Sequence, residues 1–368
     1  MLELKKIKTV KKLYLLLGFF LLYFLLVLKP HVMVYAGSWQ MEAGLAEEIV
    51  SQYGLALLPE EFEQLKGQKP LYEAGKTDIF IEQNPEYAAL QVHSLKELMN
   101  LMGGRVLSLE EENRLWFQLY KGVSSEVVTA DMERLILFDI WDYYIESYEQ
   151  AVRGESQYEN LTPQALKRVE ERNKKEVYSP LPGNVTTYNF ELLRYFAVFM
   201  MVSTTFFVMP YMVSENRSRM PALQYSFRKG RYYYQNRMAA VVITVLCIAA
   251  VECALYLYCA GIDRVFAFWN CALSGFASGF ISWLPWTLGS YTVCVLLLMV
   301  LASVGLSLIV FVITNSLSSH VSAIAWQIPV AVFSCVYGGL VCFKAGEIDN
   351  PMLSAPAVGL GVFAVAIL

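Results

Sequence analysis

Glu252 is an acidic residue inside a long apolar stretch, AAVECALYLY, and it is the first candidate for chemistry in this sequence. An ionisable group within a membrane span is costly, and such groups commonly line ion or substrate pathways or pair with an opposite charge. Arg194, near the end of another apolar stretch, is the candidate partner. A structural ion pair and a pathway-lining or ion-coupling role are both open for Glu252.

Other common chemistries lack their residues in this chain. The seven cysteines form no CxxC motif and no cluster with histidine, and the three histidines are scattered, so the sequence predicts no metal centre or redox motif. No G-x-x-x-x-G-K-[S/T] motif is present, so the chain has no nucleotide site of that kind. A membrane-embedded enzyme would need polar residues clustered within the apolar stretches, and Glu252 stands nearly alone there.

A short basic segment, residues 214–237, separates two long apolar stretches. Within it Met220, Leu223 and Phe227 recur at helical spacing, and Gly230 is a natural helix end. We therefore expect a short amphipathic helix that lies flat on the membrane surface. It can serve either as a basic anchor for acidic lipid headgroups or as a docking handle for a soluble partner.

The composition predicts a membrane protein with an acidic domain outside the bilayer. Of the 368 residues 56% are hydrophobic and only 17% are charged, whereas soluble domains carry about 25% charged residues. The charge is unevenly divided: residues 37–190 carry −12 (26 Asp and Glu against 14 Lys and Arg), and the rest of the chain carries +8.

Long apolar runs predict an all-α polytopic membrane protein with about six transmembrane helices and a mainly helical extracytoplasmic domain between helices 1 and 2. The sixth run has about 15 residues where roughly 20 are needed, so we expect it to be truncated. The expected order is a cytoplasmic basic N-terminus (1–12), transmembrane helix 1 (13–35), the extracytoplasmic domain (37–190), transmembrane helix 2 (192–213), the cytoplasmic segment (214–237), transmembrane helix 3 (238–260), a Trp-rich outer interfacial or re-entrant segment (261–288), transmembrane helices 4 (289–314) and 5 (321–343), and the start of transmembrane helix 6 (354–368).

Basic residues set the expected orientation. The two segments placed inside, 1–12 and 214–237, hold 11 Lys and Arg, whereas the short outer loops hold only Arg264 and Lys344. Short cytoplasmic segments are enriched in Lys and Arg. The N-terminus is therefore expected in the cytoplasm.

Local signals divide residues 37–190 into helices. Ser108 with Glu111 forms a capping-box pattern, Thr129 is the expected cap of a long helix, and Pro163 occupies a favoured first-turn position. One helix is expected from Asn84 through Gly103–Gly104. The stretch KTDIFIEQ (76–83) is the candidate for a single short strand, and Ser179–Val185 is the expected linker back to the membrane.

From residue 192 onward the chain resembles the integral membrane (permease) subunit of ABC-2 type exporters, in the bacterial branch with a large domain between the first two spans. The matching features are Glu215 just after span two, the short helix MPALQYSF, Gly230-Arg231, and Arg237 opening span three. The stretch WTLGSYTVCVLLLMVLASVGLSLIVFVITNSLSSHVSAIA is similar to the fourth and fifth spans of that family.

The resemblance implies that segment 214–237 is a coupling helix that docks on a separate ABC ATPase. ATP and Mg²⁺ would bind to that partner, so this chain is expected to hold no cofactor and to be no enzyme itself. It would pair with a second permease subunit, as homo- or heterodimer, in the bacterial cell membrane, without nucleic acid. The implied docking residues are Glu215, Arg217, Arg219, Met220, Leu223, Phe227, Arg228, Gly230 and Arg231.

A ligand-sensing membrane receptor that uses the extracytoplasmic domain is the alternative from another functional class. Such a receptor normally has an output domain inside the cell, and the largest segment placed inside here, 214–237, has only about 24 residues.

Overall fold

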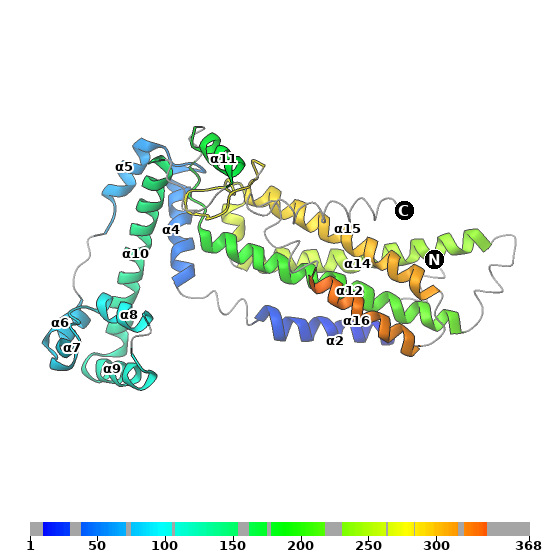
Figure 1. Ribbon diagram of the computed structural model, residues 1–368, viewed down its shortest axis with the longest axis horizontal. Helices are drawn as coiled ribbons and strands as arrows, with labels where there is room; N and C mark the ends of the chain where they lie inside the picture. The colour runs from blue at the N-terminus through cyan, green and yellow to red at the C-terminus, as the bar shows by residue number, and fades with distance from the viewer. Residues whose placement is uncertain are drawn as a thin grey trace.

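The computed structural model is an elongated helical bundle with a separate helical lobe at one end (Figure 1). It describes residues 10–29, 38–70, 75–104, 107–153, 162–174, 178–217, 230–262, 264–282, 284–315 and 320–336. These residues form helices joined by irregular segments, with one isolated bridge between Ala272 and Thr287 and no strand. The all-α class predicted from the sequence is thus confirmed for the described residues.

Within the described ranges three helices are long and apolar enough to cross a membrane, so the chain is a multi-pass membrane protein. They are α12 (Gly183–Arg217), α14 (Gly230–Ile262) and α15 (Leu288–Asn315). Two shorter apolar helical segments lie beside them, α2 (Val10–Tyr23) with the π-helical turn η1 (Phe24–Leu28), and α16 (His320–Val336). The proposed sixth helix, residues 354–368, lies outside the described residues.

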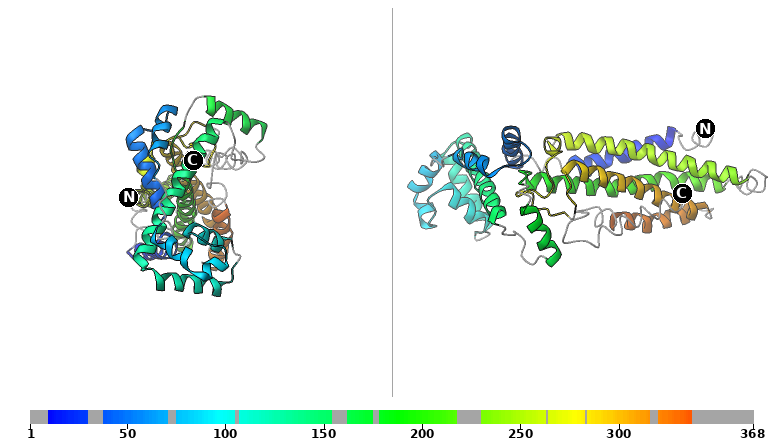
Figure 2. Two further views of the ribbon diagram at one scale, coloured as in Figure 1. Left: turned by 90° about the vertical axis from the view of Figure 1, so that its left-hand side faces the viewer. Right: turned by 90° about the horizontal axis from the view of Figure 1, so that it is seen from above.

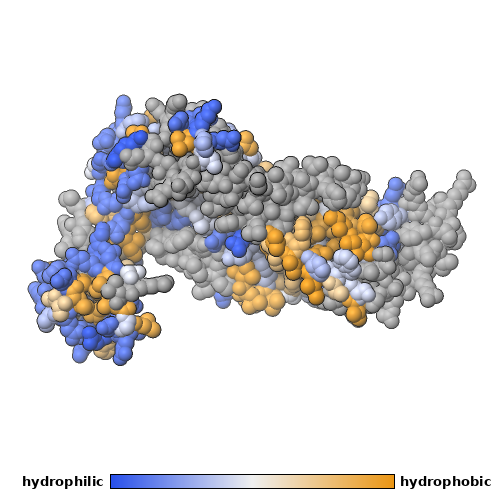
Figure 3. Space-filling view, in the orientation of Figure 1, coloured by the Kyte–Doolittle hydropathy of each residue, from blue (hydrophilic) through white to orange (hydrophobic). Residues whose placement is uncertain are grey.

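Helix α12 is the centre of the bundle and packs against α2, α14, α15 and α16. Its own stretch from Gly183 onward is helical, so part of the expected linker Ser179–Val185 belongs to the helix. Large apolar side chains on the outward faces of η1 and α14, such as Leu26 and Tyr258, are exposed. The space-filling view shows the resulting apolar surface over the bundle and a mostly polar surface over the lobe (Figure 3). Such a surface suits lipid contact.

The lobe consists of helices from the described part of residues 38–174, with two hydrophobic centres. One centre, around Ile81, Tyr87, Leu98 and Leu119, lies at the tip; the other is continuous with the core of the bundle. In the view from above the lobe lies beyond one end of the bundle (Figure 2), and in the view of Figure 1 it extends to one side of the bundle axis. The helices are α4 (Ser38–Tyr53), α5 (Pro59–Gly67), α6 (Lys76–Gln83), α7 (Pro85–Ala89), α8 (Leu95–Gly103), α9 (Leu109–Gly122), α10 (Ser125–Arg153) and α11 (Pro163–Lys174).

The strand prediction for residues 76–83 is wrong, because these residues form α6. The Asp131 carboxylate, on α10, accepts hydrogen bonds from the backbone N–H (3.1 Å) and the hydroxyl (2.8 Å) of Thr77 in the first turn. Thr77 and Ile81, one turn apart, are both buried. A partner 54 residues away therefore satisfies one of the free N–H groups of this helix start, that of Thr77, and stabilises a helix that local propensity alone did not indicate.

Two further boundaries differ from expectation. The helix predicted from Asn84 to Gly104 is interrupted after α7, where Gln91 has φ of 57°, and α8 starts anew with Ser94 as its cap. Thr129 lies inside α10, where its hydroxyl donates to the Ser125 carbonyl. The predicted box at Ser108 and Glu111 and the helix start at Pro163 are confirmed.

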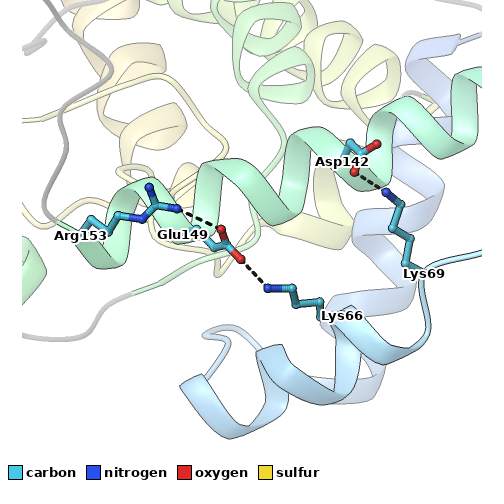
Figure 4. Close-up of polar contacts among 5 residues, drawn as sticks. All are labelled: Lys66, Lys69, Asp142, Glu149 and Arg153. Carbon is cyan, nitrogen blue, oxygen red and sulfur yellow. Dashed lines mark hydrogen bonds and ion pairs between the residues drawn. The ribbon is translucent and has the colours of Figure 1, made fainter.

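Exposed ion pairs connect α5 and its following residues to α10 (Figure 4). Glu149 accepts from Lys66 (2.6 Å) and from Arg153 (3.1 Å), and Lys69 pairs with Asp142. Solvent-exposed pairs each contribute about 0–1 kcal/mol. The buried stack of Phe62 on Tyr148, with ring centroids 3.9 Å apart, is the larger contribution to this contact.

Residues 264–287 form a compact irregular cap between the lobe and the bundle. They contain the short 3-10 helix η2 (Val265–Phe268), and no helix of spanning length occurs among their described residues. Phe276 packs edge-on against Tyr144 and Tyr148 of α10, while Phe280 packs against Phe190 of α12. The cap therefore connects lobe and bundle through buried aromatic rings.

Candidate functional site in the membrane helices

Glu252 is fully buried between the membrane helices. Its side chain extends from α14 toward α12, where the Ser203 hydroxyl lies 2.5 Å from Oε1. The second oxygen, Oε2, has no hydrogen-bond partner among the described residues. A carboxyl group in this position is therefore only half satisfied by the protein.

Arg194 does not form the predicted pair with Glu252. Its side chain is exposed on α12, and it precedes Ser203 by nine residues, about 14 Å along the helix. The structure thus pairs Glu252 with a neutral hydroxyl instead of a cation.

Ser203 has two acceptors within reach but only one hydroxyl hydrogen. Its Oγ lies 2.5 Å from Glu252 Oε1 and 3.2 Å from the Met200 carbonyl oxygen. If the carboxyl is ionised, Ser203 donates to it; if the carboxyl is protonated, Glu252 donates to Ser203, which then donates to Met200. The second arrangement satisfies all three groups.

A second polar cluster lies nearer the lobe and was missed by sequence reasoning. The Asn189 amide nitrogen donates to the Thr292 hydroxyl (3.0 Å), and the Tyr256 hydroxyl donates to the Asn189 side-chain oxygen. All three side chains are buried and come from α12, α15 and α14. One amide therefore connects three membrane helices. The signal that could have found it is the spacing of Asn189 and Ser203, 14 residues apart and close to four helical turns.

Ser303 and Ser307 of α15 lie at the level of Ser203. Helices α12 and α15 run parallel, since Asn189 bonds Thr292 near their starts and Met209 packs with Val310 near their ends. At about 1.5 Å per residue, Ser203 lies about 21 Å beyond Asn189, and the two serines about 16 and 22 Å beyond Thr292. Because 11 residues make about three turns, Ser303 also lies on the Thr292 face of α15.

We call Asn189, Ser203, Glu252, Tyr256, Thr292 and Ser303 the polar seam. Like Glu252 Oε2, the buried hydroxyls of Ser303, Ser307 and the neighbouring Tyr23 have no hydrogen-bond partner among the described residues. Native proteins rarely leave several such atoms unsatisfied at one level of a core. The polar seam is therefore suited to hold a proton, water or a small cation. No group of three or more His, Cys, Asp and Glu that could bind a metal ion occurs in the described part of the chain.

The predicted docking set is only partly within the described residues. Glu215 and Arg217 end α12, and Gly230 and Arg231 begin α14. These ends lie at the far end of the bundle from the lobe (Figure 1). Arg237, on the next turns of α14, is fully buried, with its guanidinium 5.9 Å from the centre of the Tyr233 ring. The remaining members lie outside the described residues: Arg219, Met220, Leu223, Phe227 and Arg228.

Outside the membrane helices, Glu42 of α4 has a strongly shifted ionisation. Partial burial raises the pKa of its carboxyl to about 7, because the charged form loses hydration. The folded state then favours the neutral acid. The contribution of Glu42 to the free energy of unfolding is therefore present at low pH and is lost as the pH rises through about 7.

Exchange of Glu42 for glutamine is expected to flatten the pH dependence of stability. Between about pH 5 and about pH 8, the Glu42→Gln variant should lose less stability than the native chain, with a difference of at most about 3 kcal/mol. Thermal unfolding of the purified full chain at several pH values measures this. Glu48→Gln, at an exposed position on the same helix, is the control; equal pH profiles for all three proteins would contradict the assignment.

Comparisons with known proteins returned no relative: no family model, no curated protein and no solved structure matches the chain. What is established is the architecture, a multi-pass membrane protein whose described residues are of the all-α class.

Proposed function

We propose that this chain is the membrane subunit of an ATP-driven exporter of the ABC-2 type, with ATP hydrolysis in a separate partner chain. The main support is the length and continuity of α12 and α14, which flank segment 214–237. Their 35 and 33 residues correspond to about 52 and 50 Å, whereas the hydrocarbon core of a bilayer is about 30 Å thick. Both helices therefore extend well beyond the membrane.

Continuous helices of this length transmit a force applied at one end. A soluble ATPase that grips segment 214–237 would tilt α12 and α14 as rigid rods. Both helices carry residues of the polar seam, so such a tilt would separate Ser203 from Glu252, and Asn189 from Tyr256. Export by alternating exposure of the bundle interior follows from that movement. A second permease subunit would complete the pathway.

Phe227 is the residue on which the docking assignment is tested. The Phe227→Asp variant should lower affinity for a Walker-motif ATPase encoded in the neighbouring reading frame by about 30-fold or more, as loss of a buried aromatic hot spot costs at least about 2 kcal/mol. Copurification from membranes and titration with the purified ATPase give the affinity.

Tyr225→Asp is the matched control, since Tyr225 is also aromatic and lies opposite Phe227 on the predicted helix. It should change the affinity by less than about threefold. Undiminished binding of the Phe227→Asp variant, or equal losses in both variants, would contradict the docking assignment.

A cysteine introduced at Ser226 should resist a membrane-impermeant reagent on intact cells; ready labelling from outside would refute the orientation.

The receptor alternative has one observation in its favour, the close packing of lobe on bundle. The Leu57 N–H donates to the Tyr178 carbonyl (2.8 Å), and Arg264 in the cap pairs with Glu47 of α4 (2.8 Å). A receptor would signal without an ATPase. Failure to copurify any ATPase, together with a ligand that stabilises the lobe, would favour it.

A further inference from the structure

Glu252 is the buried ionisable group for which docking of an ATPase provides no role. It lies on the same face of α14 as Tyr256, four residues apart, and it contributes to the polar seam. An isolated ionised carboxylate in a low-dielectric interior costs several kcal/mol unless a cation or several donors compensate it. An ionised Glu252 would therefore need a cation or several hydrogen-bond donors beside its carboxylate.

The described surroundings of Glu252 supply hydroxyls and no cation. The titratable groups that interact with it are Tyr23 from α2 and Cys253 from its own helix, and α12 contributes the Ser203 hydroxyl. Tyr195 and Cys259 lie beside Tyr23. At this level helix α15 contributes serines, and its titratable side chains, Tyr291 and Cys294, lie nearer its start. No charged side chain of the described residues interacts with the carboxyl group.

The hydrogen bonds available to Glu252 suit a neutral acid and are too few to compensate an ionised one. In the chain Glu252 O–H to Ser203 to Met200 carbonyl, each donor has one acceptor at 2.5 and 3.2 Å. Ionisation would turn the Ser203 hydrogen back to Glu252 and leave the charge with a single donor, because Oε2 has no partner among the described residues. A single carboxyl group also matches a single monovalent ligand, and a divalent cation would need further acidic ligands that the described residues do not supply.

We propose that Glu252 is a proton-binding site within the membrane bundle, occupied at neutral pH in this conformation and paired with Ser203 as its hydrogen-bond acceptor. Release of the proton breaks the Glu252 O–H bond, transfers H⁺ to water and leaves a carboxylate that Ser203 then caps. No redox partner or cofactor takes part. The site adds a proton-binding step to the proposed exporter, and its test requires no ATPase.

A hydrophobic carbodiimide tests the proposal on the full-length protein in lipid nanodiscs. The reagent adds to a protonated carboxyl group without a leaving group, so mass spectrometry locates the modified residue by the mass of the whole reagent. At about pH 6 an ordinary glutamate is almost fully ionised. We expect Glu252 to be labelled there, with at least about fivefold less labelling at about pH 9. Exposed acids such as Glu110 should remain unlabelled at both pH values and serve as internal controls.

Two variants keep the result interpretable. Glu252→Gln should remove the label from this segment, together with an infrared carbonyl band of a protonated carboxyl group. Ser203→Ala retains the acid but removes the hydroxyl that caps the ionised form, so its labelling should persist to higher pH than in the native chain. An unchanged midpoint in Ser203→Ala would contradict the Ser203 pairing.

Three outcomes would overturn the proton site itself. They are absence of labelling at Glu252 at about pH 6, labelling that does not respond to pH, and protection of Glu252 by sodium ions at constant pH and ionic strength. Protection by sodium would mean that a metal cation occupies the polar seam in place of the proton.

Discussion

Replacement of Gly275 by alanine is expected to destabilise the protein by about 3 kcal/mol, through a clash between two backbone segments. A Cβ atom at Gly275 would lie 2.5 Å from the Ser179 carbonyl oxygen and 3.4 Å from the Leu181 Cβ atom. Ser179 and Leu181 are fully buried, so neither can move aside without opening the cap. Thermal unfolding of the purified full chain, with the fraction that remains monodisperse in detergent, measures the loss.

Gly103→Ala is the matched control for Gly275→Ala. Gly103 ends α8, and a Cβ atom there would meet no atom within 4 Å. We expect this variant to change stability by less than about 1 kcal/mol, since alanine is the better helix former. Equal unfolding temperatures for the two alanine variants would contradict the close packing of the cap on residues 179–181. Gly183, whose Cβ would lie 2.8 Å from the Ala277 carbonyl oxygen, provides a second variant at the same contact.

Asn189→Leu is the second substitution with a large expected effect, a loss of about 2 kcal/mol. Leucine has a similar volume and preserves the helix, but it removes the amide that joins α12 to α14 and α15. The buried hydroxyls of Tyr256 and Thr292 then lose the Asn189 partner, and each such loss costs about 1–3 kcal/mol in proteins and less within membranes.

A double-mutant cycle separates this network from general packing. Tyr256→Phe removes one hydroxyl and retains the ring that packs against Phe196. The double variant Asn189→Leu, Tyr256→Phe should be less destabilised than the sum of the two single variants, because the leucine no longer leaves a tyrosine hydroxyl unsatisfied. Strict additivity would show that the Asn189–Tyr256 hydrogen bond contributes nothing. Thr205→Val is the control, because the Thr205 hydroxyl donates to a carbonyl of its own helix and joins no other.

The docking proposal and the proton-site proposal depend on different residues, although both involve α12 and α14. Docking depends on the apolar residues expected in segment 214–237, whereas the proton site depends on side chains inside the bundle. Phe227→Asp should therefore leave carbodiimide labelling of Glu252 unchanged, and Glu252→Gln should leave ATPase affinity unchanged. Each proposal can then fail without the other.

The sequence by itself determined the features that arise from neighbouring residues. Apolar runs of about 20 residues predicted α12, α14 and α15 because a membrane span requires that length of apolar side chains. The Ser108 capping box and the start at Pro163 were also predictable, since their signals act within a single helical turn. Glu252 could also be recognised as a functional candidate from its neighbours, because the free-energy cost of its carboxyl group depends on the apolar segment around it.

Only the tertiary structure decided which residues meet. Residues 76–83 are helical because Asp131 satisfies the first turn from 54 positions away, and Glu252 pairs with Ser203, 49 positions away, instead of with Arg194. The network of Asn189, Tyr256 and Thr292 likewise draws on three helices. The spacing of Asn189 and Ser203 indicates a polar face on α12, but the partners that these residues meet depend on how the helices rotate and pack about one another.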